Sequence, residues 1–150
     1  PLMGRNNRSG YSAKPETQLS AFLANQPGVV ARLSEALAEK GVNILAMAVL
    51  DTVDIGTMRM VVDDLDVAKE ALDEAGAAYV DVPVITIPIP NLQGGFGHIA
   101  RVLAAANINI EYVYATSIPG TDYSLGVFRV SDRDAALELD YELEPEPAAR

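Results

Sequence analysis

Asn25-Gln26-Pro27-Gly28 opens a segment that recurs 66 positions later, where the chain reads Asn91-Leu92-Gln93-Gly94-Gly95-Phe96. The amphipathic stretch after each loop leads into a matching motif, Gly41-Val42-Asn43-Ile44 in the first copy and Asn107-Ile108-Asn109-Ile110 in the second. Self-similarity at a fixed spacing indicates that one supersecondary unit is used twice. The chain is therefore expected to fold as two similar units.

The first copy begins with a strand and a helix. Apolar residues on both faces of the segment from Thr17 to Leu23 predict a central strand. Pro27 suits the first turn of a helix, where its missing N–H costs nothing. An apolar stripe at helical spacing follows, formed by Val30, Leu33 and Leu37, and Gly41 ends the helix.

The rest of the first copy predicts a hairpin and a second helix. Residues 42–50 form a buried strand and residues 56–62 its partner, and Asp63-Asp64 opens a helix that Gly76 ends. Residues 79–90 are extended. Their three prolines lack a donor, which argues against a fully paired central strand.

The second copy repeats this order with a weaker end. We expect a helix over residues 94–106, strands over 108–117 and 123–130, and a short helix over 132–139. The acidic residues that follow predict a short, displaced or disordered last strand. The βαββαβ order taken twice is ferredoxin-like and belongs to the α+β class, with two antiparallel sheets side by side. The expected domains are a flexible tail over 1–16, repeats over 17–83 and 84–140, and an acidic tail or degenerate strand over 141–150.

Composition excludes several kinds of site. The formal net charge of −10 opposes binding to nucleic-acid phosphates, which depends on Lys and Arg. The chain has no Cys and a single His, His98, which we expect to be exposed, so thiol catalysis and a Cys or His metal site are not expected. The sequence shows no apolar run of the roughly 20 residues that a membrane span requires. We expect a cytoplasmic protein without cofactor or metal.

The order of these motifs resembles the ACT domain: strand, Asn-Gln-Pro-Gly loop, amphipathic helix, Gly-Val-Asn-Ile, strand, and the turn Asp51-Thr52-Val53-Asp54-Ile55-Gly56. The doubled arrangement is similar to the small stand-alone proteins with tandem ACT domains, over roughly Thr17 to Asp140. The resemblance implies a non-catalytic regulatory module that binds an amino acid. It also implies a homodimer and a partner enzyme that acts in trans.

ACT domains commonly hold their effector between the strand-to-helix loop of one domain and the second strand of its neighbour. Carried over to this sequence, the resemblance implies a ligand site formed by Asn25, Gln26, Pro27, Gly28, Val29, Asn43, Ile44, Asn91, Leu92, Gln93, Gly94, Gly95, Phe96, Asn109 and Ile110. Backbone N–H groups at a helix start suit a carboxylate, and Asn can both donate and accept. The neutral loops and their apolar residues favour a small or apolar amino acid.

Each expected site also has a purely structural interpretation. The Gly loops can be tight turns without a ligand, and Asn43 and Asn109 can satisfy backbone groups at a strand start. Three other functions remain open. The strongest is an interaction or regulatory subunit of a metabolic enzyme that binds no ligand. An acylphosphatase-type hydrolase would need an Arg in a Gly loop, and an RNA-binding module would need exposed aromatic and basic residues on its central strands.

Overall fold

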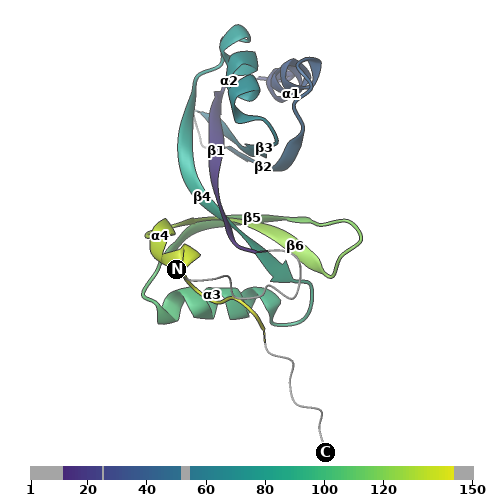
Figure 1. The fold of residues 1–150 in the computed structure, drawn as a ribbon. Helices are drawn as coiled ribbons and strands as arrows, with labels where there is room; N and C mark the ends of the chain where they lie inside the picture. The colour runs from purple at the N-terminus through teal and green to yellow at the C-terminus, as the bar shows by residue number, and fades with distance from the viewer. Residues whose placement is uncertain (1–11, 25, 52–54, 144–150) are drawn as a thin grey trace, which may run out of the picture. The chain divides into compact units, whose positions relative to one another are not determined.

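The computed structural model describes residues 12–24, 26–51 and 55–143. These residues form six strands and four helices, labelled in Figure 1: β1 (Lys14–Leu23), α1 (Val29–Glu39), β2 (Ile44–Asp51), β3 (Gly56–Val62), α2 (Leu65–Glu74), β4 (Tyr79–Pro90), α3 (Gly95–Ala105), β5 (Ile110–Ser117), β6 (Tyr123–Val130) and α4 (Arg133–Leu137). The strands are hydrogen-bonded in the order β2-β3-β1-β4-β6-β5. This order confirms the predicted α+β class and the βαββαβ arrangement.

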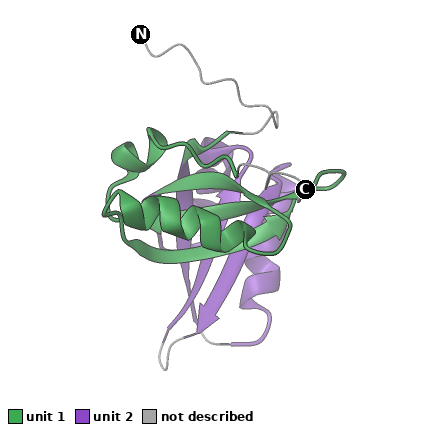
Figure 2. Cartoon of the chain, turned by 90° about the horizontal axis from the view of Figure 1, so that it is seen from below, with its two compact units in different colours: residues 1–15, 84–150 green, residues 16–83 purple. Residues whose placement is uncertain are grey.

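The chain divides into two compact units (Figure 2). Unit 2 comprises residues 16–83 and holds the first copy of the repeat, and unit 1 comprises residues 1–15 and 84–150 and holds the second. The boundaries fall inside β1 and β4, so each of these strands continues from one unit into the other.

Unit 2 buries one hydrophobic core between its two helices and one face of its strands. In β1 and β3, Leu19 pairs with Met60 and Ala21 with Met58, so the side chains of these four residues lie on the same face. The core also contains Leu33, Leu37, Ala68 and Leu72 from α1 and α2. The α1 stripe predicted from helical spacing is thus the buried face of that helix.

Unit 1 has a hydrophobic core of its own, built in the same way from its helices and strands. Its core consists of Ile85, Ile87, Ile89, Ile99, Leu103, Ile108, Phe128 and Ala136. The shorter α4 contributes Ala136 as its buried residue. Asp132 caps α4 by accepting from the backbone N–H of Ala135 at 3.0 Å, as Asp64 caps α2 by accepting from Val67 at 3.2 Å.

The start of β1 completes unit 1. After α4, the described residues 138–143 contain no strand, in line with the weak last strand predicted there. Lys14 instead lies beside β4, where its carbonyl oxygen accepts from Thr86 Oγ1 at 3.5 Å, and Ala13 packs against the unit 1 core. β1 therefore begins three residues before the predicted Thr17, and residues 14–16 belong to the sheet rather than to a tail.

β4 is a central strand despite its prolines, which corrects the expectation for residues 79–90. Pro88 and Pro90 are both in register with β6. The next residue, Asn91, donates its N–H to the carbonyl oxygen of Asp122 at 2.8 Å. Because successive backbone groups of a strand point to opposite sides, the nitrogens of Pro88 and Pro90 face away from β6. Their missing donors therefore remove no hydrogen bond to that neighbour.

Candidate functional site

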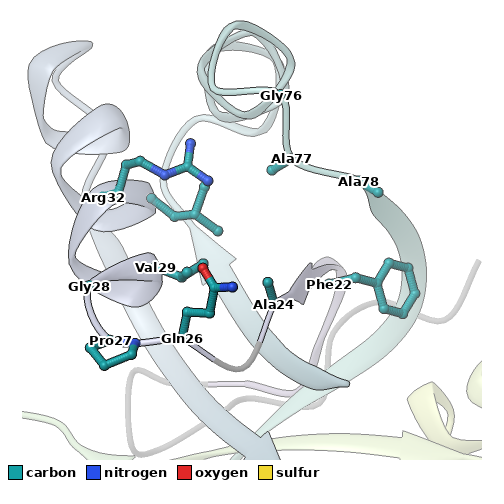
Figure 3. A pocket seen from close by; sticks show the side chains of 11 residues that line it. Phe22, Ala24, Gln26, Pro27, Gly28, Val29, Arg32, Gly76, Ala77 and Ala78 are labelled. Atoms are coloured by element: carbon teal, nitrogen blue, oxygen red, sulfur yellow. The ribbon is translucent and has the colours of Figure 1, made fainter. Parts of the chain in front are cut away.

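A pocket of about 570 Å³ lies in unit 2, at the N-terminal end of α1 (Figure 3). One wall is the β1–α1 loop together with the first turns of α1. The opposite wall is the turn from α2 into β4. The lining residues are Phe22, Ala24, Gln26, Pro27, Gly28, Val29, Arg32, Leu33, Gly76, Ala77 and Ala78.

The first wall depends on the backbone of Gly28. This residue has φ 89° and ψ −8°, in the left-handed region that favours glycine, and its carbonyl oxygen accepts from the N–H of Arg32 at 2.9 Å. Ahead of it, Gln26 donates its N–H to Ala24 at 2.8 Å. The loop thus reverses the chain tightly and starts α1 beside the pocket.

The second wall is tied to the first by two hydrogen bonds. Phe22 in β1 donates its N–H to the carbonyl oxygen of Ala78 at 2.9 Å. Arg32 in α1 donates from Nη1 to the carbonyl oxygen of Ala75 at 2.8 Å, at the C-terminal end of α2. One backbone and one guanidinium hydrogen bond therefore connect the two sides of the pocket.

The charge of the pocket comes from Arg32, which is the charged residue among those that line it. Its side chain extends from α1 toward the turn at Gly76 and Ala77 (Figure 3). The rest of the lining is apolar or neutral. In a chain with a net charge of −10, this pocket thus offers a cation on a largely uncharged wall.

The corresponding loop of unit 1 has the same backbone but a tighter interior. Gly94 matches Gly28, with φ 82° and ψ 0°. The next residue, Gly95, is buried, and a Cβ atom there would lie 2.0 Å from the carbonyl oxygen of Pro90. Phe96 is stacked on Phe128, with 6.2 Å between ring centroids. The Pro90 carbonyl therefore occupies the space that a side chain at residue 95 would need.

His98 is not simply exposed, so the expectation for this residue is wrong. Its Nε2 atom lies 3.1 Å from the carbonyl oxygen of Tyr141 and 3.0 Å from that of Glu142. Carbonyl oxygens only accept, so Nε2 carries the proton and donates to both. Tyr141 in turn donates its hydroxyl to Ala136 at 2.6 Å, and burial raises the pKa of Tyr141 to about 12.

Asn43 and Asn109 make matching backbone contacts at their strand starts. Asn43 donates its N–H to Asp63 Oδ1 at 2.9 Å, and its carbonyl oxygen accepts from the N–H of Asp63 at 3.1 Å. Asn109 donates to Ser131 Oγ at 2.9 Å and accepts from the N–H of Ser131 at 2.9 Å. These contacts supply the structural role considered for both residues, and a ligand role for their exposed side chains stays a prediction.

The structure brings part of the predicted site together. Four of the loop residues, Gln26 to Val29, line the pocket, and Asn25 lies outside the described residues. Ile44 and Ile110 pack against the cores of units 2 and 1 respectively. Residues 91–94 form the loop before α3, Gly95 and Phe96 begin that helix, and none of these six residues lines this pocket.

Sequence reasoning missed Phe22, Arg32 and the turn at residues 76–78, which also line the pocket. A signal for Arg32 was present, because Arg32 and His98 lie 66 residues apart and so occupy equivalent positions of the repeat. No such signal marks the turn, since its place beside the loop follows from the path of β4.

Two kinds of site are not found in the described part of the chain. Within residues 12–24, 26–51 and 55–143, no helix is both long and apolar enough to cross a bilayer. Over the same residues, no three acidic or His side chains are grouped so that they could hold a metal ion.

Known proteins share this fold, and some share part of the sequence. Residues 16–143 match the ACT domain pair family. The crystal structure of protein BT0572 from Bacteroides thetaiotaomicron is similar, with 31% identity, a TM-score of 0.78, and coverage of 84% of this chain and 86% of that one. A search of curated proteins finds no match.

Two regulatory subunits of aspartate kinase share the fold at lower identity. The Thermus thermophilus subunit, in a ligand-free form, has 18% identity and a TM-score of 0.62, over 87% of this chain and 95% of that one. The Thermus flavus subunit has 18% identity and a TM-score of 0.57, over 85% and 93%. The family match spans both units and agrees with the predicted tandem repeat. This chain therefore belongs to the ACT domain pair family.

Proposed function

We propose that this chain is a non-catalytic sensor that binds an amino acid in the unit 2 pocket and regulates a partner protein acting in trans. The observation that carries the proposal is the pocket itself, because four residues of the predicted ligand loop line it. The fold shared with the regulatory subunits of aspartate kinase supports a regulatory role.

The dimensions and lining of the pocket fit a small ligand. A volume of about 570 Å³ lies within the range of roughly 300 to 1,000 Å³ that is usual for small-molecule sites. Phe22, Val29 and the two alanines of the turn offer an apolar wall, which favours a small or apolar amino acid. At roughly 0.3 to 1.5 kcal/mol per heavy atom, such a ligand would bind with a Kd of about micromolar to millimolar.

The mechanism we propose is a population shift. A ligand that contacts the β1–α1 loop and the α2–β4 turn at once would favour conformations in which both walls are ordered. Because the ligand would bind the ordered state more tightly than a less ordered one, it would increase the population of the ordered state. The surface shown to the partner would change as a result. Closure of the site by the second strand of a neighbouring repeat, at Asn43–Ile44 or Asn109–Ile110, stays a prediction from the family resemblance.

We also propose that the chain forms a homodimer through β2. This strand, which the sequence predicted to be buried, lies instead at the end of the strand order, and its Leu45, Met47 and Val49 are 45%, 47% and 46% exposed. An exposed apolar row on an edge strand favours association with another surface. The same row supports the alternative function, in which the chain is a ligand-free subunit of a metabolic enzyme and β2 contacts that enzyme.

The test is thermal denaturation of the chain with each of the twenty amino acids at millimolar concentration. Ligand at 100 times its Kd should add about 2.7 kcal/mol to the free energy of unfolding, which raises Tm by several degrees. The same series is measured for Ala24→Leu, which adds bulk to the pocket, and for Ala31→Leu, an exposed position of α1 outside the lining.

The proposal requires that at least one amino acid raise Tm in the wild type and in Ala31→Leu but not in Ala24→Leu. If no amino acid raises Tm, the sensor function is wrong and the ligand-free subunit is favoured. If Ala24→Leu responds as well as Ala31→Leu, the ligand binds elsewhere.

A further inference from the structure

Arg32 and His98 make the same structural contact in the two copies of the repeat. Arg32 donates to the carbonyl oxygen of Ala75 at 2.8 Å, and His98 donates to that of Tyr141 at 3.1 Å. Both the donors and the acceptors are 66 residues apart in the sequence. The contact joins the helix that follows the Gly loop to the segment after the second helix of each unit. A single N–H donor is sufficient for it, because His98 makes it in unit 1.

An arginine at this position therefore has more N–H donors than this contact requires. Its guanidinium carries five N–H donors in a planar fork, and in Arg32 one nitrogen is engaged with Ala75. Among the described residues, no carboxylate is paired with Arg32, whereas Lys40, Lys69 and Arg129 each form an ion pair. The remaining donors of Arg32 are thus available on the pocket side.

We propose that Arg32 binds the carboxylate of the ligand, so that the unit 2 pocket selects small monocarboxylates with an apolar group. This inference rests on the proposed function and adds the chemical class of its ligand. A guanidinium fork matches the two oxygens of a carboxylate, and such charge-assisted hydrogen bonds are the strong ones. Phe22 and Val29 then lie on the apolar part of the lining, available to the rest of the ligand.

Unit 1 lacks this chemistry at the equivalent position. The Nε2 proton of His98 is shared between the carbonyl oxygens of Tyr141 and Glu142. The imidazole of His98 has no planar fork of N–H donors that could match both oxygens of a carboxylate. We therefore expect one carboxylate ligand per chain, bound in unit 2.

The experiment compares each of the twenty amino acids with its C-terminal amide by isothermal titration calorimetry. Replacing the carboxylate by a neutral amide should weaken binding to the wild type by about 10- to 100-fold, as expected for loss of a charge-assisted pair. Arg32→His, which keeps a donor for Ala75, should bind the acid about as weakly as the wild type binds the amide. His98→Gln, the matched change in unit 1, should bind the acid as the wild type does.

The outcomes separate this inference from the function on which it rests. If no amino acid binds the wild type, the proposed function fails and the inference fails with it. If an amino acid binds and its amide binds equally well, the function stands and the role of Arg32 is wrong. This acid-to-amide ratio is measured on the wild type, so it can overturn the inference even if Arg32→His does not fold. Equal binding by Arg32→His and the wild type would also overturn the inference.

Discussion

Among the differences between the two Gly loops, the one at the first helical residue changes what the loop borders. Val29 in unit 2 and Gly95 in unit 1 are 66 positions apart and both begin a helix. Val29 packs against the unit 2 core and lines the pocket. In Gly95, the space for a side chain is taken by the Pro90 carbonyl. The same backbone turn thus borders a pocket in one unit and packs on its own strand in the other.

Gly95→Ala should destabilise unit 1, because its Cβ would lie 2.0 Å from a backbone oxygen that cannot move freely. Overpacking of this kind costs about 1 to 3 kcal/mol or more. Gly97→Ala is the control, since a Cβ there meets nothing within 4 Å, and it should stabilise α3 by about 0.5 to 1 kcal/mol. Urea unfolding of the two variants measures both effects, and equal stability of the two would contradict the predicted clash.

Tyr141→Phe should remove the hydroxyl hydrogen bond to Ala136 at a cost of about 1 kcal/mol at neutral pH. The pKa of Tyr141 is raised from 10.0 to about 12 by burial, so the folded protein favours the neutral phenol. This contribution is fully present below pH 10 and is lost as the pH rises toward 12.

The difference in unfolding free energy between the wild type and Tyr141→Phe should therefore shrink above pH 10. Denaturant unfolding of both proteins from pH 8 to 11.5 checks the sign, and the other tyrosines cancel in the difference. A difference that grows with pH would show that Tyr141 ionises more readily in the folded state than in the unfolded chain.

At the scale of elements, the first residues of β1 stabilise unit 1, although most of the strand belongs to unit 2. Residues up to Pro15 fall in unit 1, and the remainder of β1 falls in unit 2. Ala13 and Lys14 contact the unit 1 core and Thr86. Removing them should expose the edge of β4 in unit 1.

Deletion of residues 1–14 should therefore weaken unit 1 more than unit 2. We expect amide hydrogen exchange in β6 to accelerate by about 10-fold or more, while β2 and β3 keep their protection. Deletion of residues 1–11 is the control, because it leaves Ala13 and Lys14 in place. Uniform acceleration in both units would mean that they unfold as one.

Asp64→Ala should destabilise α2 by about 1 kcal/mol, because it removes the acceptor for the N–H of Val67 at the helix start. Asp66→Ala, in the first turn of the same helix, removes a charge without removing the cap and should cost less. Thermal unfolding of both variants measures the difference. Equal losses would show that charge rather than the cap hydrogen bond stabilises this end.

The sequence predicted the elements whose signals are local. Gly41 and Gly76 mark helix ends and have φ values of 77° and 71°, and β3 and β6 have the predicted bounds. Ser12 to Glu16 carry no apolar pattern, so the start of β1 was missed, since its place is fixed by the neighbouring β4. The prolines of β4 led to the wrong prediction that residues 79–90 are not a central strand. Their effect depends on which neighbouring strand the proline nitrogen faces, and the sequence does not show this.

Only the part of the candidate site that lies in the β1–α1 loop could be predicted from the sequence. Gln26 to Val29 were found from the repeat and the family resemblance. Phe22 and Arg32 flank this loop. Apart from the equivalence of Arg32 and His98 in the repeat, nothing in the sequence distinguishes these two residues from an ordinary strand end and an exposed helix residue. The opposite wall comes from a turn about fifty residues later, and only the fold brings it there.

At the scale of the whole molecule, β2 is the surface through which we propose that the homodimer forms. Met47 and Val49 pair with Met60 and Met58, so their side chains point to the same side of the sheet as the unit 2 core. They are nevertheless about half exposed, at 47% and 46%. A second copy covering this edge would remove apolar surface from water.

Met47→Glu should therefore shift the chain toward monomer, because it places a charge on the proposed interface of a protein with a net charge of −10. Leu92→Glu, on a residue that is 58% exposed in unit 1, is the matched control and should leave association unchanged. Sedimentation velocity over a range of concentrations measures both. A monomeric wild type, or equal association of the two variants, would contradict a dimer through β2.

The shared strand β1 also affects how the protein is made on the ribosome. Residues 13 and 14 leave the exit tunnel about seventy residues ahead of the rest of the core they pack against, which begins at residue 84. At roughly 5 to 20 residues per second, the nascent segment waits several seconds for its neighbours. The first repeat can thus fold before the second, which closes only after its own residues have been made and which uses a segment that precedes the first repeat as its last strand.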